Sequence, residues 1–349
     1  MITITDIAQK AGVSRTTVSY VLNARSEQER ISEETRLRVL AAASELGYSR
    51  NELARAVTTG QSRTLGFWVM ESHHEPVARV LAGAMKEADA NDYFIKMLGF
   101  DNYAPGAQIV ERCMAWRVSG ILAIHAGETA LDSVYAPIAK SGIPLVLVDS
   151  SAACADTIHV TSDQKQGVRD MVSHLAEIGH QKIAFIAGRS DEEPTAVSSR
   201  RIVAYCETMR ELGLGRYENV QYGFWDEAET RRIVQEMLSL PPHSPQRPTA
   251  LACWSDYTAM VAIQTAAQMG LRVPQDISVS GFDDITVAPW TNPPLTTVAQ
   301  HFEEMGSRAV RHLLNSDPTE LVPREDALPT RLVIRESTAP PSHQLPHEL

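Results

Sequence analysis

The chain has 349 residues, 44% of them hydrophobic, with no apolar run long enough to span a membrane and no secretory signal at its start. Its four cysteines (Cys113, Cys154, Cys206 and Cys253) are at least 41 positions apart, which favours inert thiols in a reducing cytoplasm over disulfides or a zinc site. The net charge of −11 arises after residue 60, because residues 1–60 carry 8 basic and 7 acidic side chains. The charge therefore permits DNA binding by the first sixty residues without indicating it.

Residues 1–48 carry the apolar spacing of three short helices. Thr5 is the predicted cap of the first helix, which ends at Gly12, and Ser14 is the predicted cap of the second. The third helix is predicted to begin at Ser32 and to end at Gly47. The residues predicted to be buried in the first and third helices are Ile4, Ile7, Ala8, Ala11, Leu37, Leu40 and Ala41. Two helices joined by a short glycine-containing turn predict a helix-turn-helix.

The second of these helices, within VSRTTVSYVLN at residues 13–23, has an unusual polar face. Val18, Val21 and Leu22 recur at helical spacing and predict its packed side. The opposite side carries Arg15 and short hydroxyls, although serine and threonine are weak helix formers. Such a helix fits the major groove of DNA, where short side chains let the backbone approach phosphates closely. The alternative is an ordinary solvated face of a small helical bundle.

Residues 49–62 predict a linker, because only about two helical turns are possible there and so short a helix is marginal in water unless something holds it. From residue 63 apolar runs alternate with amphipathic stretches, which is typical of parallel sheets covered on both faces. The predicted strands are TLGFWVM, YFIKMLGF, GILAIHA, PLVLVDS, KIAFIAG, NVQYGF, TALACWS and ISVSGFDD. Two stretches repeat the order strand, helix, turn and strand ending in aspartate, so we expect two similar lobes with a cleft between them.

The predicted architecture is therefore α/β, with an all-α headpiece at residues 1–48, a linker at 49–62 and a two-lobed core of doubly wound parallel sheets at 63–338. The first lobe is predicted to contain residues 63–161 and 292–322. The second is predicted to contain residues 162–291 and 323–338. Residues 339–349 include three prolines and predict a disordered tail.

Segments along the whole chain resemble the LacI/GalR family of bacterial transcription repressors. They are, in the family's order, ITDIAQKAGVSRTTVSYVLN, ISEETRLRVLAAASELGY, LAEIGHQKIAFIAG, SSRRIVAYCETMRELGL, GLRVPQDISVSGFDD, PPLTTVAQ and RLVIREST. The resemblance implies a cytoplasmic homodimer, associated with the nucleoid when bound, that recognises a near-palindromic operator. It also implies a periplasmic-binding-protein-like core that senses a small molecule, with no cofactor, no metal and no membrane partner.

By match to the family, the residues that contact DNA fall into three groups. The base readers are Arg15, Thr16 and Tyr20, and the phosphate contacts are Ser14, Thr17, Ser19 and Asn23. An arginine among the readers can donate two hydrogen bonds to guanine. The linker residues that match the family's minor-groove segment are Ala54, Arg55 and Val57. Val57 stands where the family has a larger leucine and Arg50 where it usually has proline, so the match leaves the bend of the DNA open.

The match also assigns a ligand site between the lobes. Arg201, Asp256 and Trp225 hold the positions of the family's effector-binding arginine, strand-end aspartate and stacking aromatic. Further candidates at the cleft are Asp149, Asp163, His73, His74 and His125. This chemistry suits a sugar, whose hydroxyls bond the charged groups and whose apolar face stacks on the ring; a sugar acid, a sugar phosphate or a purine would also fit. The alternatives are that strand-end aspartates cap helices, that the tryptophan is core and that the histidines are surface residues.

Three other functions compete with a ligand-controlled repressor. An enzyme of this fold class often carries a nucleophile, phosphate-binding or zinc motif, and none of these motifs is present in the sequence. An exported sugar-binding protein would need a signal peptide and no headpiece. A regulator whose core responds to a partner protein stays open. The sequence also leaves open whether the effector releases the operator or tightens its binding.

Overall fold

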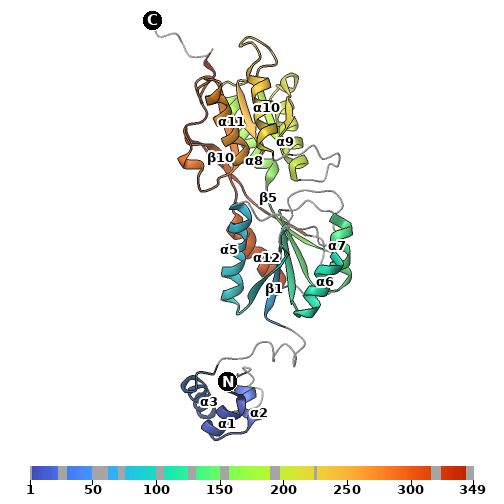
Figure 1. Cartoon of the computed structure of the whole chain (residues 1–349), viewed down its shortest axis with the longest axis vertical. Helices are drawn as coiled ribbons and strands as arrows, with labels where there is room; N and C mark the ends of the chain where they lie inside the picture. Colours follow the sequence, from blue (N-terminus) through green and yellow to red (C-terminus); the bar gives the residue numbers. More distant parts are fainter. Residues whose placement is uncertain are drawn as a thin grey trace. The chain divides into compact units, whose positions relative to one another are not determined.

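The computed structural model describes residues 2–22, 30–48, 62–69, 75–99, 106–124, 131–149, 157–188, 197–223, 226–315 and 324–342 (Figure 1). The chain divides into two compact units, Met1–Ser62 and Arg63–Leu349. Among the described residues no helix has the length and apolarity needed to cross a membrane. In the same part of the chain no three His, Cys, Asp or Glu side chains are grouped as a metal site would require.

The first unit contains the three predicted helices: α1 (Ile4–Ala11), α2 (Arg15–Leu22) and α3 (Glu33–Glu45). Thr3, and not the predicted Thr5, caps α1, because the Asp6 carboxylate accepts hydrogen bonds of 2.7 Å from both the backbone N–H and the hydroxyl of Thr3. Gly12 ends α1 with a φ of +64°, a left-handed conformation that favours glycine. Ser32 caps α3 as predicted, by accepting from the backbone N–H of Thr35.

The prediction for the buried face of α3 was wrong. Leu37 is 54% exposed, Leu40 is 37% exposed and Ala41 is exposed as well, whereas Val39 is buried with Ala42 and Ala43 of the same helix. These small side chains let α3 approach the buried residues of the other two helices, which are Ile7, Ala8, Ala11, Val18 and Val21. The two leucines were predicted to be buried because they are larger and more apolar than the alanines on the opposite face.

The second unit has two six-stranded sheets, one in each lobe. The first sheet has the order β11-β5-β4-β3-β1-β2 and the second has the order β12-β10-β9-β8-β6-β7. Within the described ranges all strand pairs are parallel except β10 with β12. This arrangement confirms the predicted two-lobed core of parallel-dominated sheets.

The first lobe contains the strands β1 (Thr64–Val69), β2 (Phe94–Gly99), β3 (Gly120–Ile124), β4 (Leu145–Val148), β5 (Ile158–Ser162) and β11 (Arg324–Leu328). Its helices are α5 (Glu75–Ala90), α6 (Gly106–Ala115), α7 (Leu131–Lys140) and α12 (Phe302–Asn315). Helices α5 and α12 cover one face of the sheet and α6 and α7 cover the other (Figure 1). A Cβ atom on Gly306 of α12 would lie 2.0 Å from the carbonyl oxygen of Val80 in α5, so the two helices approach too closely for any larger residue.

The second lobe contains the strands β6 (Ile183–Ala187), β7 (Val220–Tyr222), β8 (Ala250–Cys253), β9 (Ser278–Asp283), β10 (Thr296–Ala299) and β12 (Arg331–Val333). Its helices are α8 (Gln164–Glu177), α9 (Val197–Glu211), α10 (Glu227–Leu238), α11 (Asp256–Gln268) and the short 3-10 turns η1 (Gly215–Tyr217) and η2 (Ala288–Trp290). Helices α8 and α9 pack with one set of core residues and α10 and α11 with another. The second lobe is therefore a second three-layered α/β unit.

The predicted lobe boundaries were wrong in two segments. Strand β10 pairs with β9 in the second sheet, although residues 292–322 were assigned to the first lobe. Strand β11 pairs with β5 in the first sheet, although residues 323–338 were assigned to the second lobe. The chain therefore crosses between the lobes three times, at residues 162–164, 299–302 and 328–331.

The predicted tail begins too early. The backbone N–H of Ala339 donates to the Ser278 hydroxyl over 3.0 Å, and its carbonyl accepts from the same hydroxyl, so this residue belongs to the second lobe. Residues 343–349 and most of the predicted linker at 49–62 lie outside the described residues.

Inert thiols are expected to be buried, and two of the cysteines are. Cys113 and Cys253 are fully buried, whereas Cys206 is half-buried. Burial raises the pKa of the Cys113 thiol to about 11, so this thiol stays protonated and unreactive at neutral pH. Cys154 lies outside the described residues.

Candidate functional site

Helix α2 has the packed side that its sequence predicts and a polar side that faces solvent. Val18 and Val21 are buried against the other headpiece helices. On the opposite side Arg15 and Thr16 are exposed, and Tyr20 is half-buried one turn further on. Because residues i and i+4 share a helix face, these three side chains can reach one DNA groove together.

The start of α2 is held by hydroxyl groups. The backbone N–H of Thr17 donates to the Ser14 hydroxyl over 3.0 Å, and the two side-chain oxygens are 2.9 Å apart. Ser14 therefore caps the helix as predicted. The remaining predicted DNA contacts at Asn23, Ala54, Arg55 and Val57 lie outside the described residues.

The second candidate site lies at the carboxyl ends of the strands in the core and is centred on Arg201 of α9. This side chain is 3% exposed. Its Nε donates to Oε1 of Gln164 and its Nη1 to the backbone carbonyl of Trp254, and its Nη2 lies 3.9 Å from a carboxylate oxygen of Asp283. The guanidinium also lies 3.9 Å from the ring centre of Phe282. Burial lowers the pKa of Arg201, while nearby carboxylates oppose that change.

Two glutamines extend this cluster across both lobes. Gln164, at the first chain crossing, donates to Asp149 at the end of β4 over 3.1 Å and to Gln300 over 3.4 Å. Gln300, at the second crossing, donates to Asp283 at the end of β9 over 2.6 Å. One hydrogen-bonded network thus joins a first-lobe carboxylate to a second-lobe arginine and carboxylate. We call Arg201, Asp149, Asp283, Gln164 and Gln300 the cleft network.

Three of the six described residues other than glycine that have a positive φ lie in this network or directly after it. Asp149 has a φ of +50°, Asp283 of +127° and Asp284 of +52°. Residues other than glycine adopt positive φ at a cost of about 1–3 kcal/mol, and such residues cluster at ligand sites and switch regions. The strained aspartates therefore support a functional role for this end of the sheets.

The carboxyl groups of the site are harder to ionise than ordinary aspartates. Burial raises the pKa of Asp149 and raises that of Asp283 strongly, and the nearby Arg201 opposes both shifts. Burial also raises the pKa of Asp256 to about 6, against hydrogen bonds from Thr297 and Ile285. Burial therefore makes these carboxyl groups easier to protonate than exposed aspartates, while the Arg201 guanidinium favours the ionised form of Asp149 and of Asp283.

Two predicted effector ligands have other partners in the structure. Asp256 is 0% exposed, and its carboxylate accepts from the hydroxyl of Thr297 and, over 2.9 Å, from the backbone N–H of Ile285. Asp163 caps α8 by accepting from the backbone N–H of Gln166 over 2.9 Å, which is the alternative that the sequence had left open. Both carboxylates hold the chain in place, so the prediction that they contact the effector directly has no support in this geometry.

The structure brings together Arg201 and Asp149 of the predicted effector set. Trp225, His73, His74 and His125 lie outside the described residues. Sequence reasoning missed Asp283, Gln164 and Gln300. Asp283 ends a predicted strand, so it could have been named as a strand-end aspartate in the same way as Asp149. The two glutamines lie where the chain crosses between the lobes, and the predicted boundaries misplaced the crossing at Gln300.

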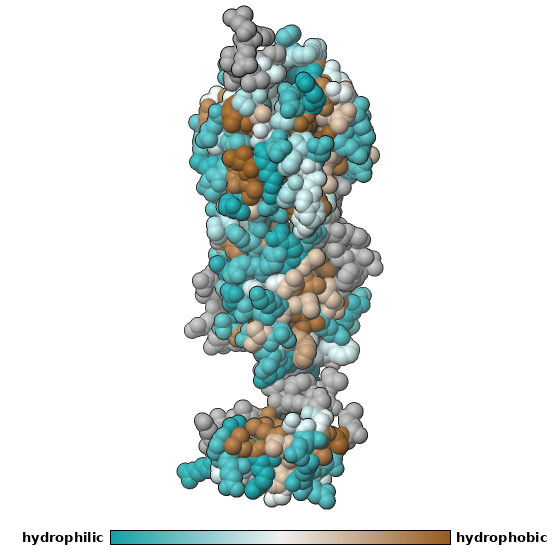
Figure 2. Space-filling model, turned by 90° about the vertical axis from the view of Figure 1, so that its left-hand side faces the viewer, coloured by the Kyte–Doolittle hydropathy of each residue, from teal (hydrophilic) through white to brown (hydrophobic). Residues whose placement is uncertain are grey.

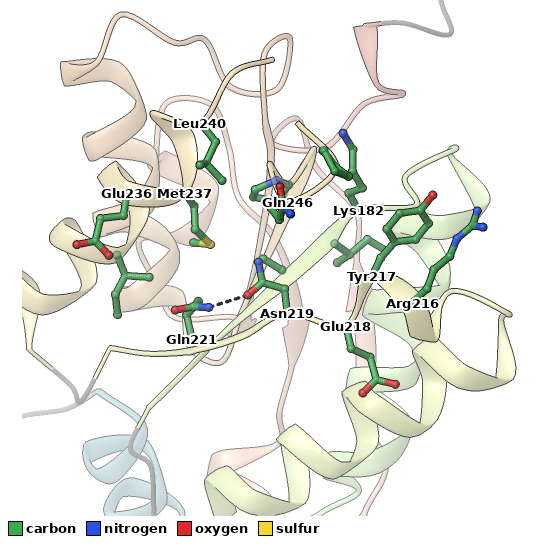
Figure 3. A pocket seen from close by; sticks show the side chains of 15 residues that line it. Lys182, Arg216, Tyr217, Glu218, Asn219, Gln221, Glu236, Met237, Leu240 and Gln246 are labelled. Atoms are coloured by element: carbon green, nitrogen blue, oxygen red, sulfur yellow. Dashed lines mark hydrogen bonds between the residues drawn. The ribbon is translucent and has the colours of Figure 1, made fainter. Parts of the chain in front are cut away.

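A separate cavity of about 620 Å³ lies at the amino ends of β6 and β7 (Figure 3). Met237 and Leu240 line one side and Lys182 and Tyr217 the other, while Gln221 donates to Asn219 over 2.7 Å below them. None of the predicted effector residues that the structure describes lines this cavity. Ligands of open α/β sheets bind at the carboxyl ends of the strands, whereas this cavity lies at the opposite end of the sheet.

Comparisons with known proteins agree with both parts of this structure. Residues 3–51 match the model of bacterial regulatory proteins of the lacI family, and residues 172–338 match a periplasmic binding protein-like domain. The HTH-type transcriptional repressor PurR of Klebsiella pneumoniae (strain 342) is 33% identical over 319 residues, which is 90% of each chain. The HTH-type transcriptional regulator MalR of Streptomyces coelicolor is 31% identical over 347 residues, which is 96% of each chain.

Solved structures show the same architecture. The lac repressor dimer bound to operator and the anti-inducer ONPF superposes with a TM-score of 0.79 at 27% identity, covering 97% of this chain and 99% of that chain. The complex of the transcriptional regulator CelR with cellobiose has a TM-score of 0.68 at 26% identity, covering 97% of this chain and 100% of the other.

The helical headpiece and the two-lobed core together define a DNA-binding transcriptional regulator and not an enzyme. The chain belongs to the LacI/GalR family of transcriptional regulators, and it is a repressor with an effector-binding core.

Proposed function

We propose that this repressor binds a near-palindromic operator as a homodimer and that a neutral sugar or sugar derivative, bound at the cleft network, changes its affinity for the operator. The observation that carries the proposal is the network itself, because it joins Asp149 of the first lobe to Arg201 and Asp283 of the second. A ligand held there contacts both lobes and favours one arrangement of them. To change operator affinity about 100-fold, it must prefer that arrangement by about 2.7 kcal/mol.

The charge of the site favours a neutral ligand over an acidic one. Two donor groups of Arg201 are already used by Gln164 and Trp254. The other arginines beside the site are each paired with a carboxylate in the described structure: Arg79 with Glu303, Arg335 with Asp284 and Arg200 with Glu325. A phosphate or carboxylate ligand would therefore enter a site without a spare cation among the described residues.

A thermal-shift screen of the full chain with sugars, sugar acids, sugar phosphates and purines tests this assignment. Binding to the folded state alone raises the melting temperature by mass action. We expect a shift with a neutral sugar that the Asp283→Asn variant loses. A shift only with an acidic sugar or a purine, or the same shift in the variant, would overturn the assignment. The CelR complex shows that a protein of similar structure binds cellobiose, which is a neutral sugar.

In the headpiece, Arg15, Thr16 and Tyr20 are proposed to read bases. Ser14, Thr17, Ser19 and Asn23 are proposed to contact phosphates, with Ala54, Arg55 and Val57 at the minor groove. The exposure of Arg15 and Thr16 on one face of α2 supports the reading role. Such a protein acts in the cytoplasm, on the nucleoid when it is bound to DNA.

The proposed dimer is supported by exposed apolar side chains next to an edge strand. Strand β2 ends the first sheet, and its Phe94 is 65% exposed. Trp116 is 51% exposed and has the ammonium of Lys96, a residue of β2, 3.3 Å from its ring centre. Figure 2 shows one face of the molecule, where apolar side chains lie at the surface among hydrophilic ones. We expect Trp116→Glu to convert a dimer to a monomer in analytical ultracentrifugation; an unaltered protein that is monomeric at micromolar concentration would contradict the dimer.

A further inference from the structure

Three residues that follow β9 are held from both lobes at once. Asp284, Ile285 and Thr286 come directly after Asp283 of the cleft network, and we call them the 284–286 strap. On the second-lobe side, the N–H of Ile285 donates to Asp256 over 2.9 Å, and the Asp284 carboxylate pairs with Arg335 over 2.6 Å. The strap is therefore anchored in the lobe to which it belongs.

On the first-lobe side, the strap is held by Glu75, the first residue of α5. Its two carboxylate oxygens accept from the backbone N–H of Thr286 over 2.9 and 3.1 Å, and one of them also accepts from the Thr286 hydroxyl over 2.8 Å. Three hydrogen bonds to one carboxylate depend on the exact position of the strap, since a displacement of about 1 Å takes such bonds beyond their normal length. Glu75 therefore responds to movement between the lobes.

Arg79 adds a second contact one helical turn along α5. Its Nε and Nη2 donate to the Glu303 carboxylate of α12 over 2.8 and 3.0 Å, while its Nη1 donates to the backbone carbonyl of Asp284 over 3.3 Å. Because Gly306 lets α12 pack directly on α5, these two helices move together with the first lobe. Arg79 thus joins this rigid pair of helices to the strap.

The strap is also joined directly to the effector site. The backbone of Asp283 continues into Asp284 with no residue between the network and the strap, and both residues have positive φ. Asp256 holds Ile285 of the strap. A ligand that changes the position of Asp283 therefore moves the strap relative to Glu75 and Arg79.

We propose that Glu75 and Arg79 are positioning residues that form, with the 284–286 strap, an interlobe latch through which the cleft network controls operator affinity. Neither residue needs to touch the effector. Asp256, which was expected to be an effector ligand, belongs to this latch as the anchor of the strap. The proposal rests on the proposed function, because it supplies the connection between the effector site and the arrangement of the lobes.

The test uses the full chain and the DNA duplex that the unaltered protein enriches from a random library. The headpiece is a compact unit separate from the core, so a core contact that adds only stability leaves the DNA affinity of the folded protein unchanged. We expect Glu75→Ala and Thr286→Val to change the dissociation constant for that duplex about fivefold or more, in the same direction. The double variant should change it no further than Glu75→Ala alone, because Thr286→Val removes only the hydroxyl bond, one of the three bonds that Glu75→Ala already removes.

Glu211→Ala is the matched control. It removes an ion pair with Arg169 of 2.9 Å that stays within the second lobe, and it should leave the dissociation constant within about twofold of the unaltered value. Hydrogen exchange of the Thr286 amide, which donates to Glu75, should speed up in Glu75→Ala and stay unchanged in the control. Unchanged DNA affinity in folded latch variants, or additive effects in the double variant, would overturn the latch alone. A chain that enriches no duplex would overturn both the latch and the proposed operator binding.

Discussion

The headpiece and the core use arginine in opposite ways. Arg15 of α2 is exposed, so its guanidinium donors point to where a partner can take them. Arg201 of the core is almost fully buried, and the chain itself occupies its Nε and Nη1. The hydrogen bonds of Arg15 are therefore available to stabilise a complex with DNA. Those of Arg201 stabilise the folded protein itself. We therefore expect changes in the headpiece to alter recognition with little effect on stability, and changes in the core network to alter both.

The largest loss of stability, which would distinguish the core from the headpiece most clearly, is expected on replacement of Arg201. Replacing Arg201 by Ala removes the donor to Gln164 and the cation beside Asp149 and Asp283, and breaking a buried pair costs about 3 kcal/mol or more. The free energy of unfolding from urea titration should fall by that amount, and the ligand response should be lost. A matched Arg200→Ala variant, which removes an exposed pair with Glu325, should cost less than about 1 kcal/mol. If the free energy of unfolding fell equally in the two variants, burial of the arginine would make no additional contribution to stability.

A second effect of similar size depends on pH and on the core alone. His180 is buried, with its ring nitrogens 2.9 Å from the hydroxyl of Thr249, 3.0 Å from that of Ser278 and 2.9 Å from the carbonyl of Ala339. Burial lowers the pKa of His180 from 6.5 to about 4, and nearby His174 adds to that shift. The unfolded chain therefore binds the proton first as the pH falls, so stability is complete above pH 6.5 and declines between 6.5 and about 4, by about 3 kcal/mol in all.

Unfolding measured by circular dichroism across this pH range checks the prediction. His180→Gln should flatten the decline, whereas His243→Gln, at an exposed position, should leave it as it is. The headpiece unit contains no histidine, so the amide resonances of its helices in NMR should not follow the same curve. A decline of equal slope in both variants would assign the pH effect to other groups.

A third effect concerns the contact between α5 and α12. In Gly306→Ala the new Cβ would meet the Val80 carbonyl oxygen and, at 2.7 Å, the backbone nitrogen of Ala84, so the helices must move apart. Overpacking of this kind costs about 1–3 kcal/mol, and the melting temperature of the core should fall accordingly. Asn315→Ala, exposed at the end of the same helix, should leave the melting temperature nearly unchanged. An unaffected Gly306→Ala variant would mean that the two helices have room to separate.

The smallest effect on stability, and the sharpest one on recognition, is expected in the headpiece. Arg15→Ala should relax the preference at one or two operator positions by about 1–3 kcal/mol without changing the melting temperature. Thr17→Ala should weaken binding to all sequences alike, because a phosphate contact carries no base preference. Binding to single-base operator variants separates the two outcomes. If both variants lose affinity uniformly, Arg15 does not read bases.

Much of this fold follows from local sequence patterns. Each of the eight predicted strand-like runs contains a strand, because buried parallel strands are continuous apolar runs such as GILAI of β3 and LVLV of β4. Strands β5, β10, β11 and β12 were missed, since IHVTS, TTVA, REDAL and RLV are short or mix polar and apolar residues. Their sheet membership depends on pairing with distant residues, which no local pattern records.

The candidate site shows the same division between local and distant information. Arg201 and Asp149 could be assigned from the sequence, because a motif and a strand end mark them. The partners of Asp256 could not be predicted, since Ile285 and Thr297 lie 29 and 41 residues further along the chain, and its contact with the effector stays a prediction. Gln164 and Gln300 carry no chemical signal of their own and gain a role only where the two lobes meet.

The three crossings between the lobes have a consequence for how the protein is made. The headpiece precedes the core along the chain and is a compact unit of its own, so it can fold before the core has been synthesised. The first sheet cannot close in the same order, because its edge strand β11 is synthesised after β6 to β10 of the second lobe have emerged. During synthesis, β5 therefore has an open edge that other chains could pair with. The first lobe is therefore completed only after most of the second lobe has been synthesised.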